Sequence, residues 1–329
     1  GMKLATYKDG TRDGQLVVVS RDLSTAHYAT GIATRMQQAL DDWGFIAPQL
    51  QDLYETLNNG KARHAFPFDP ALCMAPLPRA FQWVDGSAYL SHVTTVRTAL
   101  EIDLPNDTLE TDPLMSQGSG DSFVGAQADI HCVNEAMGLD FEAELAVITG
   151  DVPVGASADE ALEAVRLVAL VNDVSLRMVA KNELPKGLGY VQSKPATAFA
   201  PVAVTLDELG DAWDNGRVRM TVQSAVNGRK IGMCDAGADM AFHFGQLIAH
   251  VSKTRAVRAG AVIGSGAISN APTESTGKQE WPKGASCLIE KRAIEMLLDG
   301  KASTEYLKVS DSVRIEVKGK DGQSVFGAI

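Results

Sequence analysis

Residues 139–148 read Leu-Asp-Phe-Glu-Ala-Glu-Leu-Ala-Val-Ile, and their apolar side chains alternate with two glutamates. A period of two residues is typical of a half-buried β-strand. On such a strand Glu142 and Glu144 point to the same face, about 7 Å apart at ~3.3 Å per residue. Because like charges this close repel each other, something positive should lie between them. The stretch therefore predicts a strand that holds a hard divalent cation such as Mg²⁺ or Ca²⁺ on one face.

Two further acids are candidates for the same site. Asp173 follows a continuous apolar run from residue 167, which predicts a strand buried on both faces. Asp85 lies in a loop-like segment, residues 83–92, that leads towards a histidine. The alternative interpretation is that each acid is solvated or salt-bridged on its own, since short motifs often match by chance.

Size and composition indicate an ordinary globular protein. The chain has 329 residues, of which 45% are hydrophobic and 22% charged, enough for a full hydrophobic core. Its formal net charge is −11, and no basic cluster occurs along the sequence. A nucleic-acid or anionic-membrane partner is therefore not expected, because either requires a positive surface. No window approaches 18 consecutive apolar residues, so no membrane span is expected either.

The cysteine pattern indicates free thiols. Cys73, Cys132, Cys234 and Cys287 are far apart and show no CxxC spacing. This argues against a zinc site or a disulfide framework and favours a reducing compartment. The first residues also lack the apolar core of a signal peptide. We therefore expect a cytoplasmic protein.

The first 75 residues are predicted to form a small N-terminal α/β domain. Residues 2–7 and 15–20 flank a turn-rich connection suited to a hairpin. Two amphipathic helical stretches follow, at residues 29–43 and 47–59. A proline-containing segment, residues 67–79, then marks the boundary to a second domain at 76–329.

The second domain, residues 76–329, is predicted to be a β-rich α+β unit. Residues 217–222 and 313–317 alternate as strands do, and Asn227-Gly228 is typical of a type I′ hairpin. Helices are expected after the capping box at residues 157–160 and over residues 239–251. Strands at irregular spacing with interspersed helices favour a mixed β-rich fold and exclude the regular alternation of a doubly wound sheet.

Several other polar residues are candidates whose alternative interpretations are structural. Gly264-Ser265-Gly266 lacks the third glycine of a dinucleotide motif and is interpreted as a tight turn, structural or beside a ligand. His92 is a candidate for proton transfer, because histidine is the residue type that suits this role near neutral pH, although most single histidines are surface or hydrogen-bonded residues. The remaining candidates also have ordinary interpretations as salt-bridged, solvated or helix-start residues; they are Arg177, Lys194 and Glu290.

Taken in chain order, these residues form a pattern that resembles the fumarylacetoacetate hydrolase (fumarylacetoacetase) family. The pattern covers roughly residues 75–329, and its E-x-E and N-D-x-S-x-R pieces together are fairly specific. The matching pieces are Asp85 with His92 seven residues later, Glu142-x-Glu144, Asn172-Asp173-x-Ser175-x-Arg177, Lys194 and Gly264-Ser265-Gly266.

The resemblance implies a β-rich mixed roll or sandwich of the fumarylacetoacetase C-terminal type, usually a homodimer, that binds Mg²⁺ or Ca²⁺. The metal ligands implied by position are Asp85, Glu142, Glu144 and Asp173. His92 would be the general base that activates water, with Glu290 as its partner. The resemblance further implies that Arg177 and Lys194 stabilise negative charge. It makes Tyr89 and Gly266 candidates for substrate contacts.

The implied activity is metal-dependent hydrolysis of a C–C bond in a small 1,3-diketo or acylpyruvate-type acid. Such an acid can chelate a cation through two oxygens, which stabilises the enolate that leaves. Decarboxylation, hydration or isomerisation of a 2-oxo acid in the same kind of site stays open. A non-catalytic protein with a structural cation and a nicotinamide-dependent oxidoreductase are the alternatives from other classes.

Three departures from the family pattern argue against fumarylacetoacetate itself as the substrate. Ala180 stands where a glutamine is expected three residues after the arginine, and Ala267 stands where a threonine is expected. Shorter relatives also carry an acid one turn after the histidine, where this chain has Val93-Thr94-Thr95. These changes leave the predicted metal site and the proton-transfer residue in place.

Overall fold

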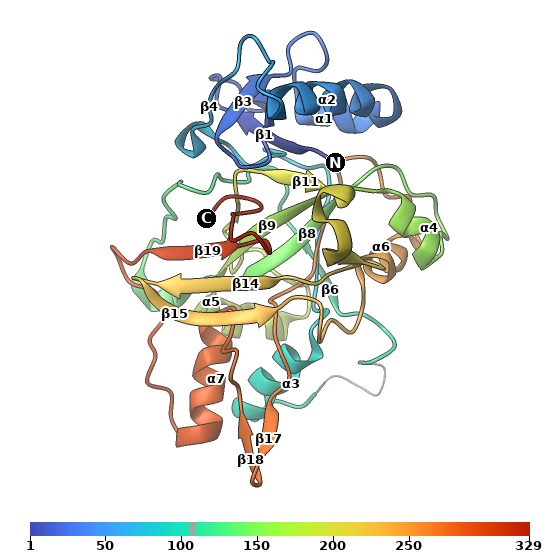
Figure 1. Ribbon diagram of the computed structural model, residues 1–329. Helices are drawn as coiled ribbons and strands as arrows, with labels where there is room; N and C mark the ends of the chain where they lie inside the picture. Colours follow the sequence, from blue (N-terminus) through green and yellow to red (C-terminus); the bar gives the residue numbers. More distant parts are fainter. Residues whose placement is uncertain (105–108) are drawn as a thin grey trace.

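The computed structural model describes residues 1–104 and 109–329. One large mixed sheet runs through the molecule (Figure 1), and β16 and β5 form a parallel pair within it. The strand order is β4 (Phe66–Pro67), β3 (Thr25–Tyr28), β2 (Gln15–Val19), β1 (Lys3–Tyr7), β11 (Ala203–Thr205), β9 (Val165–Leu176), β8 (Ala143–Thr149), β16 (Val262–Gly264), β5 (Trp83–Gly86) and β6 (Met115–Gly118). Beside this path, β9 also pairs with β10 (Ala196–Phe199) and β7 (Leu139–Asp140).

Smaller sheets and helices surround the large sheet. The smaller sheets are β15 (Arg229–Asp235), β14 (Thr221–Val226) and β19 (Val313–Val317), with the hairpins β12 (Trp213–Asp214)/β13 (Arg217–Val218) and β17 (Thr273–Ser275)/β18 (Lys278–Glu280). The helices are α1 (Met36–Asp41), α2 (Trp43–Asn58), α3 (Leu90–Ala99), α4 (Ala158–Glu163), α5 (Arg177–Glu183), α6 (Phe244–Ser252) and α7 (Leu288–Asp299). This is the predicted β-rich α+β architecture.

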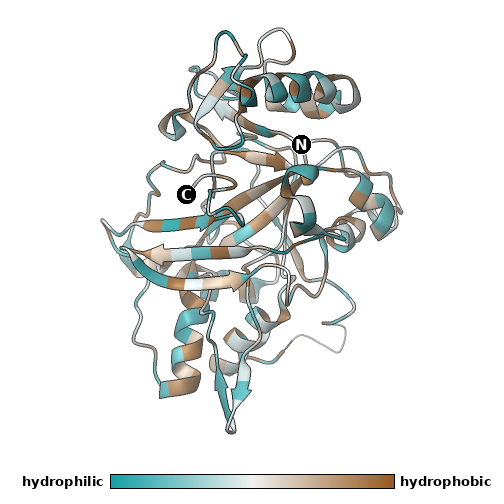
Figure 2. Cartoon of the chain, viewed as in Figure 1, coloured by the Kyte–Doolittle hydropathy of each residue, from teal (hydrophilic) through white to brown (hydrophobic). Residues whose placement is uncertain are grey.

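The central pair of strands, β8 and β9, is buried on both faces. The apolar residues of β8 point into two hydrophobic clusters, one on each side of the sheet. The prediction of a half-buried strand at residues 139–148 is therefore wrong, since Glu144 is fully buried and Glu142 is only 6% exposed. Figure 2 shows the hydrophobic character of these strands. Both glutamates thus lie inside the protein, where an unpaired charge is costly.

The N-terminal strands extend the large sheet. The predicted hairpin is present as β1 and β2, and β1 pairs with β11, so these strands share a sheet with residues 76–329. The first helix begins at Met36, seven residues later than predicted, because Gly31 has a φ of +87° and turns the chain. The second begins at Trp43, earlier than the predicted residue 47. The domain boundary near residue 75 stays a prediction.

The C-terminal part contains the predicted Asn227-Gly228 hairpin between β14 and β15. Both turn residues have positive φ, 51° and 78°, as a type I′ turn requires. The predicted strand over residues 217–222 is broken into β13 and the start of β14. The strand over residues 313–317 is present as β19 and pairs with β14.

Two helix boundaries differ from the predictions. Ser157 caps α4 through the backbone N–H of Glu160, but the helix ends at Glu163 because the next residues enter the buried strand β9. The helix expected over residues 239–251 begins only at Phe244, capped by the side chain of His243. In the described ranges, no helix combines the length and apolar character that a membrane crossing needs.

Candidate active site

Four acids from three neighbouring parts of the sheet converge on one point. Asp85 comes from β5, Glu144 from β8, Glu142 from the position just before β8, and Asp173 from β9. One carboxylate oxygen from each residue lies within 4.8 Å of the corresponding oxygens of the others. The loop-like setting expected for Asp85 is wrong, because the residue pairs with Gly264 in a regular parallel ladder. Convergence of the four acids depends on the strand register.

Two glycines make room for these carboxylates. A Cβ atom on Gly264 would lie 2.4 Å from Oδ1 of Asp85, so only glycine lets this side chain cross towards β8. Gly266 has a φ of +79°, and a Cβ there would lie 2.2 Å from the carbonyl oxygen of Gly86. Its N–H donates to Asp85 Oδ1 at 3.2 Å and to Glu144 Oε1 at 3.0 Å. The glycine-rich turn therefore contacts the acid cluster, because the backbone N–H of Gly266 donates hydrogen bonds to two of its carboxylates.

The acid cluster has the electrostatic character of a cation site. Burial, together with the neighbouring carboxylates, raises the pKa of Asp85 and of Glu144 well above the usual range. Oε2 of Glu144 is buried and has no hydrogen-bond partner among the residues that the structure describes. A buried carboxylate oxygen without a donor is unusual in a folded protein. One carboxylate oxygen from each of the four acids could act as a metal ligand here, and such oxygen ligands fit a hard divalent cation, either Mg²⁺ or Ca²⁺.

Two basic side chains border the acids. Nζ of Lys194 lies 2.9 Å from Asp173 Oδ2 and 3.3 Å from Glu142 Oε2. Nη2 of Arg177 lies 2.8 Å from the same Glu142 oxygen. Although burial opposes the effect, these two cations lower the pKa of Glu142. Glu142 is therefore compensated by protein charge, whereas Glu144 is not.

His92 forms a pair with a buried acid. The imidazole projects from the first turn of α3, and its Nδ1 lies 2.7 Å from Oε1 of Glu290 in α7. Glu290 is 1% exposed, and its other oxygen accepts a hydrogen bond of 3.1 Å from Ser269 Oγ. Because a carboxylate accepts at Nδ1, that nitrogen carries the hydrogen and Nε2 is left as the basic atom.

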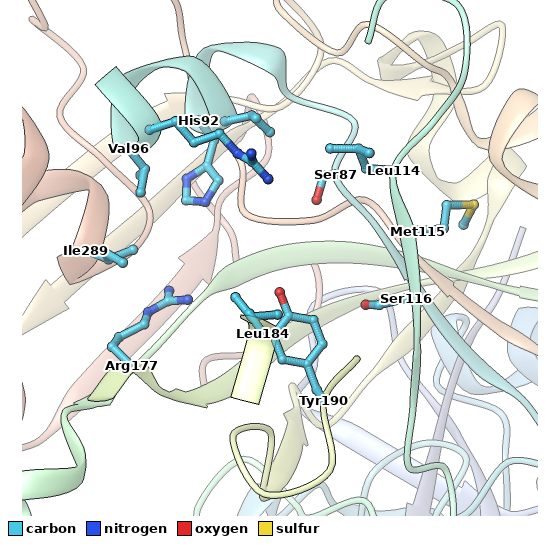
Figure 3. A pocket seen from close by; sticks show the side chains of 12 residues that line it. Ser87, His92, Val96, Leu114, Met115, Ser116, Arg177, Leu184, Tyr190 and Ile289 are labelled. Carbon is cyan, nitrogen blue, oxygen red and sulfur yellow. The ribbon is translucent and has the colours of Figure 1, made fainter. Parts of the chain in front are cut away.

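A pocket of about 330 Å³ is lined by His92 and Arg177, and the four acids are not among its lining residues. Figure 3 shows the imidazole of His92, the guanidinium of Arg177 and the ring of Tyr190 pointing into it. Nζ of Lys194 lies 5.2 Å from the centre of the Tyr190 ring. Sequence reasoning missed Tyr190 and also Arg97, which lines the pocket from the last turn of α3. The signal for Tyr190 was the glycine-rich segment before Lys194, whereas Arg97 is five residues after His92 and no sequence signal pointed to it.

Tyr89 does not reach this pocket. Its side chain is 1% exposed, and its hydroxyl donates a 2.6 Å hydrogen bond to the carbonyl oxygen of Ala236. The expected substrate contact at Tyr89 is therefore not supported, since its polar atom is already used inside the core. Tyr190 is the tyrosine that lines the pocket.

The sequence matches two family models that together span nearly the whole chain. The model described as "Fumarylacetoacetate (FAA) hydrolase C-terminal" matches residues 82–327. The model described as "Fumarylacetoacetase N-terminal domain 2" matches residues 2–79. The chain belongs to the fumarylacetoacetate hydrolase family. The β-rich fold is thus that of a fumarylacetoacetate hydrolase family protein.

Individual relatives within this family carry several names. The chain is 32% identical over 158 residues to a 2,4-didehydro-3-deoxy-L-rhamnonate hydrolase from Sphingomonas sp. (strain SKA58), covering 47% of this chain and 51% of that protein. It is 26% identical over 197 residues to the oxaloacetate tautomerase YisK from Bacillus subtilis (strain 168), covering 58% and 60%. The matched region thus spans about half to three fifths of the length of these curated relatives.

A solved structure gives the same fold over the whole chain. The fumarylacetoacetate hydrolase from Exiguobacterium antarcticum superposes with a TM-score of 0.65 at 18% identity, covering 100% of this chain and 97% of that one. At this level of identity the likeness establishes the fold. The family includes proteins named as hydrolases and as a tautomerase, so the reaction of this chain has to be argued from its own site.

Proposed function

We propose that this chain is a divalent-metal-dependent hydrolase that cleaves a C–C bond in a small acylpyruvate-type or other 1,3-diketo acid. The observation that carries the proposal is the His92–Glu290 pair, whose imidazole faces a pocket that also exposes Arg177. A base beside a fixed positive charge suits attack by water on a carbonyl group in an anionic substrate.

The cation would be held by the four acids, Asp85, Glu142, Glu144 and Asp173. When bound, Mg²⁺ or Ca²⁺ would polarise substrate oxygens and stabilise the enolate charge that develops on C–C cleavage. Lys194 is placed to hold part of the same negative charge, because its ammonium group already lies against Glu142 and Asp173. Fixed donors of this kind commonly contribute about 3 kcal/mol each to transition-state stabilisation.

His92 would take the proton from water at Nε2 while Glu290 accepts the Nδ1 hydrogen and fixes the ring. The water oxygen then bonds to the distal carbonyl carbon, and the bond between that carbon and its neighbour breaks. The electron pair goes to the leaving carbon, which takes the proton back from Nε2 of His92, and the new carboxylic acid releases the second proton of the water to solvent. Arg177 would bind the carboxylate of the substrate, since its guanidinium lines the pocket.

Tautomerisation or isomerisation of a 2-oxo acid is the second candidate. It requires proton transfer by His92 and no attack by water. The relative named as an oxaloacetate tautomerase favours this alternative. The chain also departs from the family pattern at Ala180 and Ala267, where a glutamine and a threonine are expected, although neither alanine lines the pocket.

Product analysis in labelled water separates the two reactions. With Mg²⁺ present, hydrolysis of acetylpyruvate in H₂¹⁸O should give pyruvate and acetate, with ¹⁸O in the acetate carboxylate. Tautomerisation of oxaloacetate in D₂O should instead exchange hydrogen for deuterium at C3 with no C–C bond cleavage. Turnover of a panel of acylpyruvates with ¹⁸O incorporation that stops in excess chelator supports the hydrolase. Proton exchange in oxaloacetate without any cleavage of the panel would reject it in favour of the tautomerase.

Two further properties accompany the proposal. We expect a homodimer, as the family pattern implies, and light scattering at micromolar concentration measures the mass directly against the 35.0 kDa chain. A cytoplasmic location also stays an expectation.

A further inference from the structure

Asp140 lies outside the pocket, yet it contacts two of the elements that form the site. Its side chain is fully buried on β7. Oδ2 accepts a 2.8 Å hydrogen bond from Nε of Arg177 and a 2.9 Å bond from the backbone N–H of Ile289. Oδ1 accepts a 2.7 Å bond from the backbone N–H of Leu288. One carboxylate therefore ties the start of α5 to the start of α7.

The bonds to α7 provide a cap that the helix does not supply itself. The first N–H groups of a helix have no partner within it, and a carboxylate there is also favoured by the helix dipole. The residue before the helix is Cys287, and among the described residues its side chain makes no capping hydrogen bond. Asp140 takes this role from a different strand. It thereby fixes where α7 begins.

The position of α7 sets the position of Glu290. This residue is the third of the helix, and its carboxylate holds the imidazole of His92. Arg177, the other partner of Asp140, pairs through Nη2 with Glu142 in the acid cluster. A shift of Asp140 would therefore move the His92–Glu290 pair relative to the guanidinium group of Arg177.

We propose that Asp140 is a positioning residue that sets the geometry of the His92–Glu290 pair relative to Arg177. The proposal rests on the function proposed above, in which His92 is the base. Asparagine cannot replace all the hydrogen bonds of Asp140. An amide has one acceptor oxygen, and its NH₂ group is a donor, so it cannot bond to the guanidinium or to the helix N–H groups, which are donors too. Asp140→Asn should therefore loosen one of the two attachments while leaving side-chain volume unchanged.

The test compares Asp140→Asn with Glu295→Gln in the 329-residue chain. Glu295 lies on the same helix α7 and accepts four hydrogen bonds from Ser303 and Thr304, away from the pocket. For Asp140→Asn we expect kcat for the acylpyruvate to fall about 10- to 100-fold, the range found when outer partners of a site are removed. KM is expected to rise as well where the lost attachment is the one to Arg177, the residue proposed to bind the substrate carboxylate.

A readout without substrate separates positioning from general destabilisation. The short Nδ1–H bond of His92 should give a downfield proton resonance, assigned by its loss in His92→Ala. We expect this resonance to shift or vanish in Asp140→Asn and to persist in Glu295→Gln, even if both variants lose thermal stability. Normal turnover and an unchanged resonance in folded Asp140→Asn would overturn the proposal. Failure of the wild-type protein to cleave acylpyruvates would count against the proposed function, whereas the resonance still tests Asp140.

Discussion

Replacing His92 by glutamine is expected to lower kcat by about 100- to 10,000-fold, the contribution usual for a general base. Glutamine can donate a hydrogen bond to Glu290, so the buried carboxylate keeps a partner. It has no nitrogen that can take up a proton at neutral pH, so only the basicity of the side chain is lost. Single-turnover and steady-state rates on the substrate identified by product analysis measure this effect.

Metal affinity should stay within about twofold in the same variant. The imidazole is not among the four side chains whose oxygens converge, and it faces Glu290 instead. His64→Gln is the matched control, because this histidine is exposed in the N-terminal part. If His92→Gln keeps wild-type turnover, or loses Mg²⁺ binding along with it, the assignment of His92 as the base is wrong.

Replacing Glu144 by glutamine is expected to stabilise the protein in the absence of divalent metal. The carboxylate is fully buried beside three other acids, and its Oε2 has no donor within the described residues. Removing its charge relieves both desolvation and repulsion. A gain of about 1 kcal/mol corresponds to a rise of roughly 2 °C in the melting temperature measured in excess EDTA.

The effect on stability should depend on pH in a defined direction. In the folded metal-free protein the pKa of Glu144 is raised by burial, so the folded state holds protons that the unfolded state releases. The wild-type protein therefore loses stability as the pH rises through the raised pKa, and the advantage of Glu144→Gln should grow from pH 5 to pH 8. A variant that is less stable than wild type in EDTA at pH 8 would contradict this account.

Metal addition should reverse the order of stability. At a Mg²⁺ concentration 100 times the dissociation constant, binding to the folded state adds about 2.7 kcal/mol to the stability of the wild-type protein. Glu144→Gln should show little of this increase, because it removes a charged ligand from the cluster. Glu274→Gln, an exposed substitution on β17, should behave like wild type in both conditions.

The sequence predicted the strand that carries Glu142 and Glu144 but not its depth. Alternation with apolar residues normally means that the polar side faces water, yet both faces of β8 are covered here. The local hydrophobic pattern of a strand does not predict which other elements pack against each of its faces. The convergence of Asp85 and Asp173 with the glutamates is likewise set by pairings between strands far apart in sequence. Both acids were candidates from their positions in the sequence, and the family resemblance implied that they join the glutamates.

The hydrophobic pattern of residues 139–148 indicated the face on which Asp140 lies but not its hydrogen-bond partners. Counting by twos places this residue on the same face as the two glutamates, but the pattern did not show that this face is buried. Its partners could not be inferred either, because the N–H groups of α7 lie almost 150 residues further along the chain. The helix starts at Met36 and Phe244 were missed for a related reason, since turn geometry rather than hydrophobic period fixed them.

Manganese is a suitable probe of the acid cluster, because it prefers the same oxygen ligands as Mg²⁺ and scatters X-rays anomalously. In crystals grown with MnCl₂, we predict one anomalous peak per chain, bounded by carboxylate oxygens of Asp85, Glu142, Glu144 and Asp173. Clear density for the four side chains without a peak among them would contradict the account. The cluster would then be neutralised by protons, Lys194 and Arg177 alone.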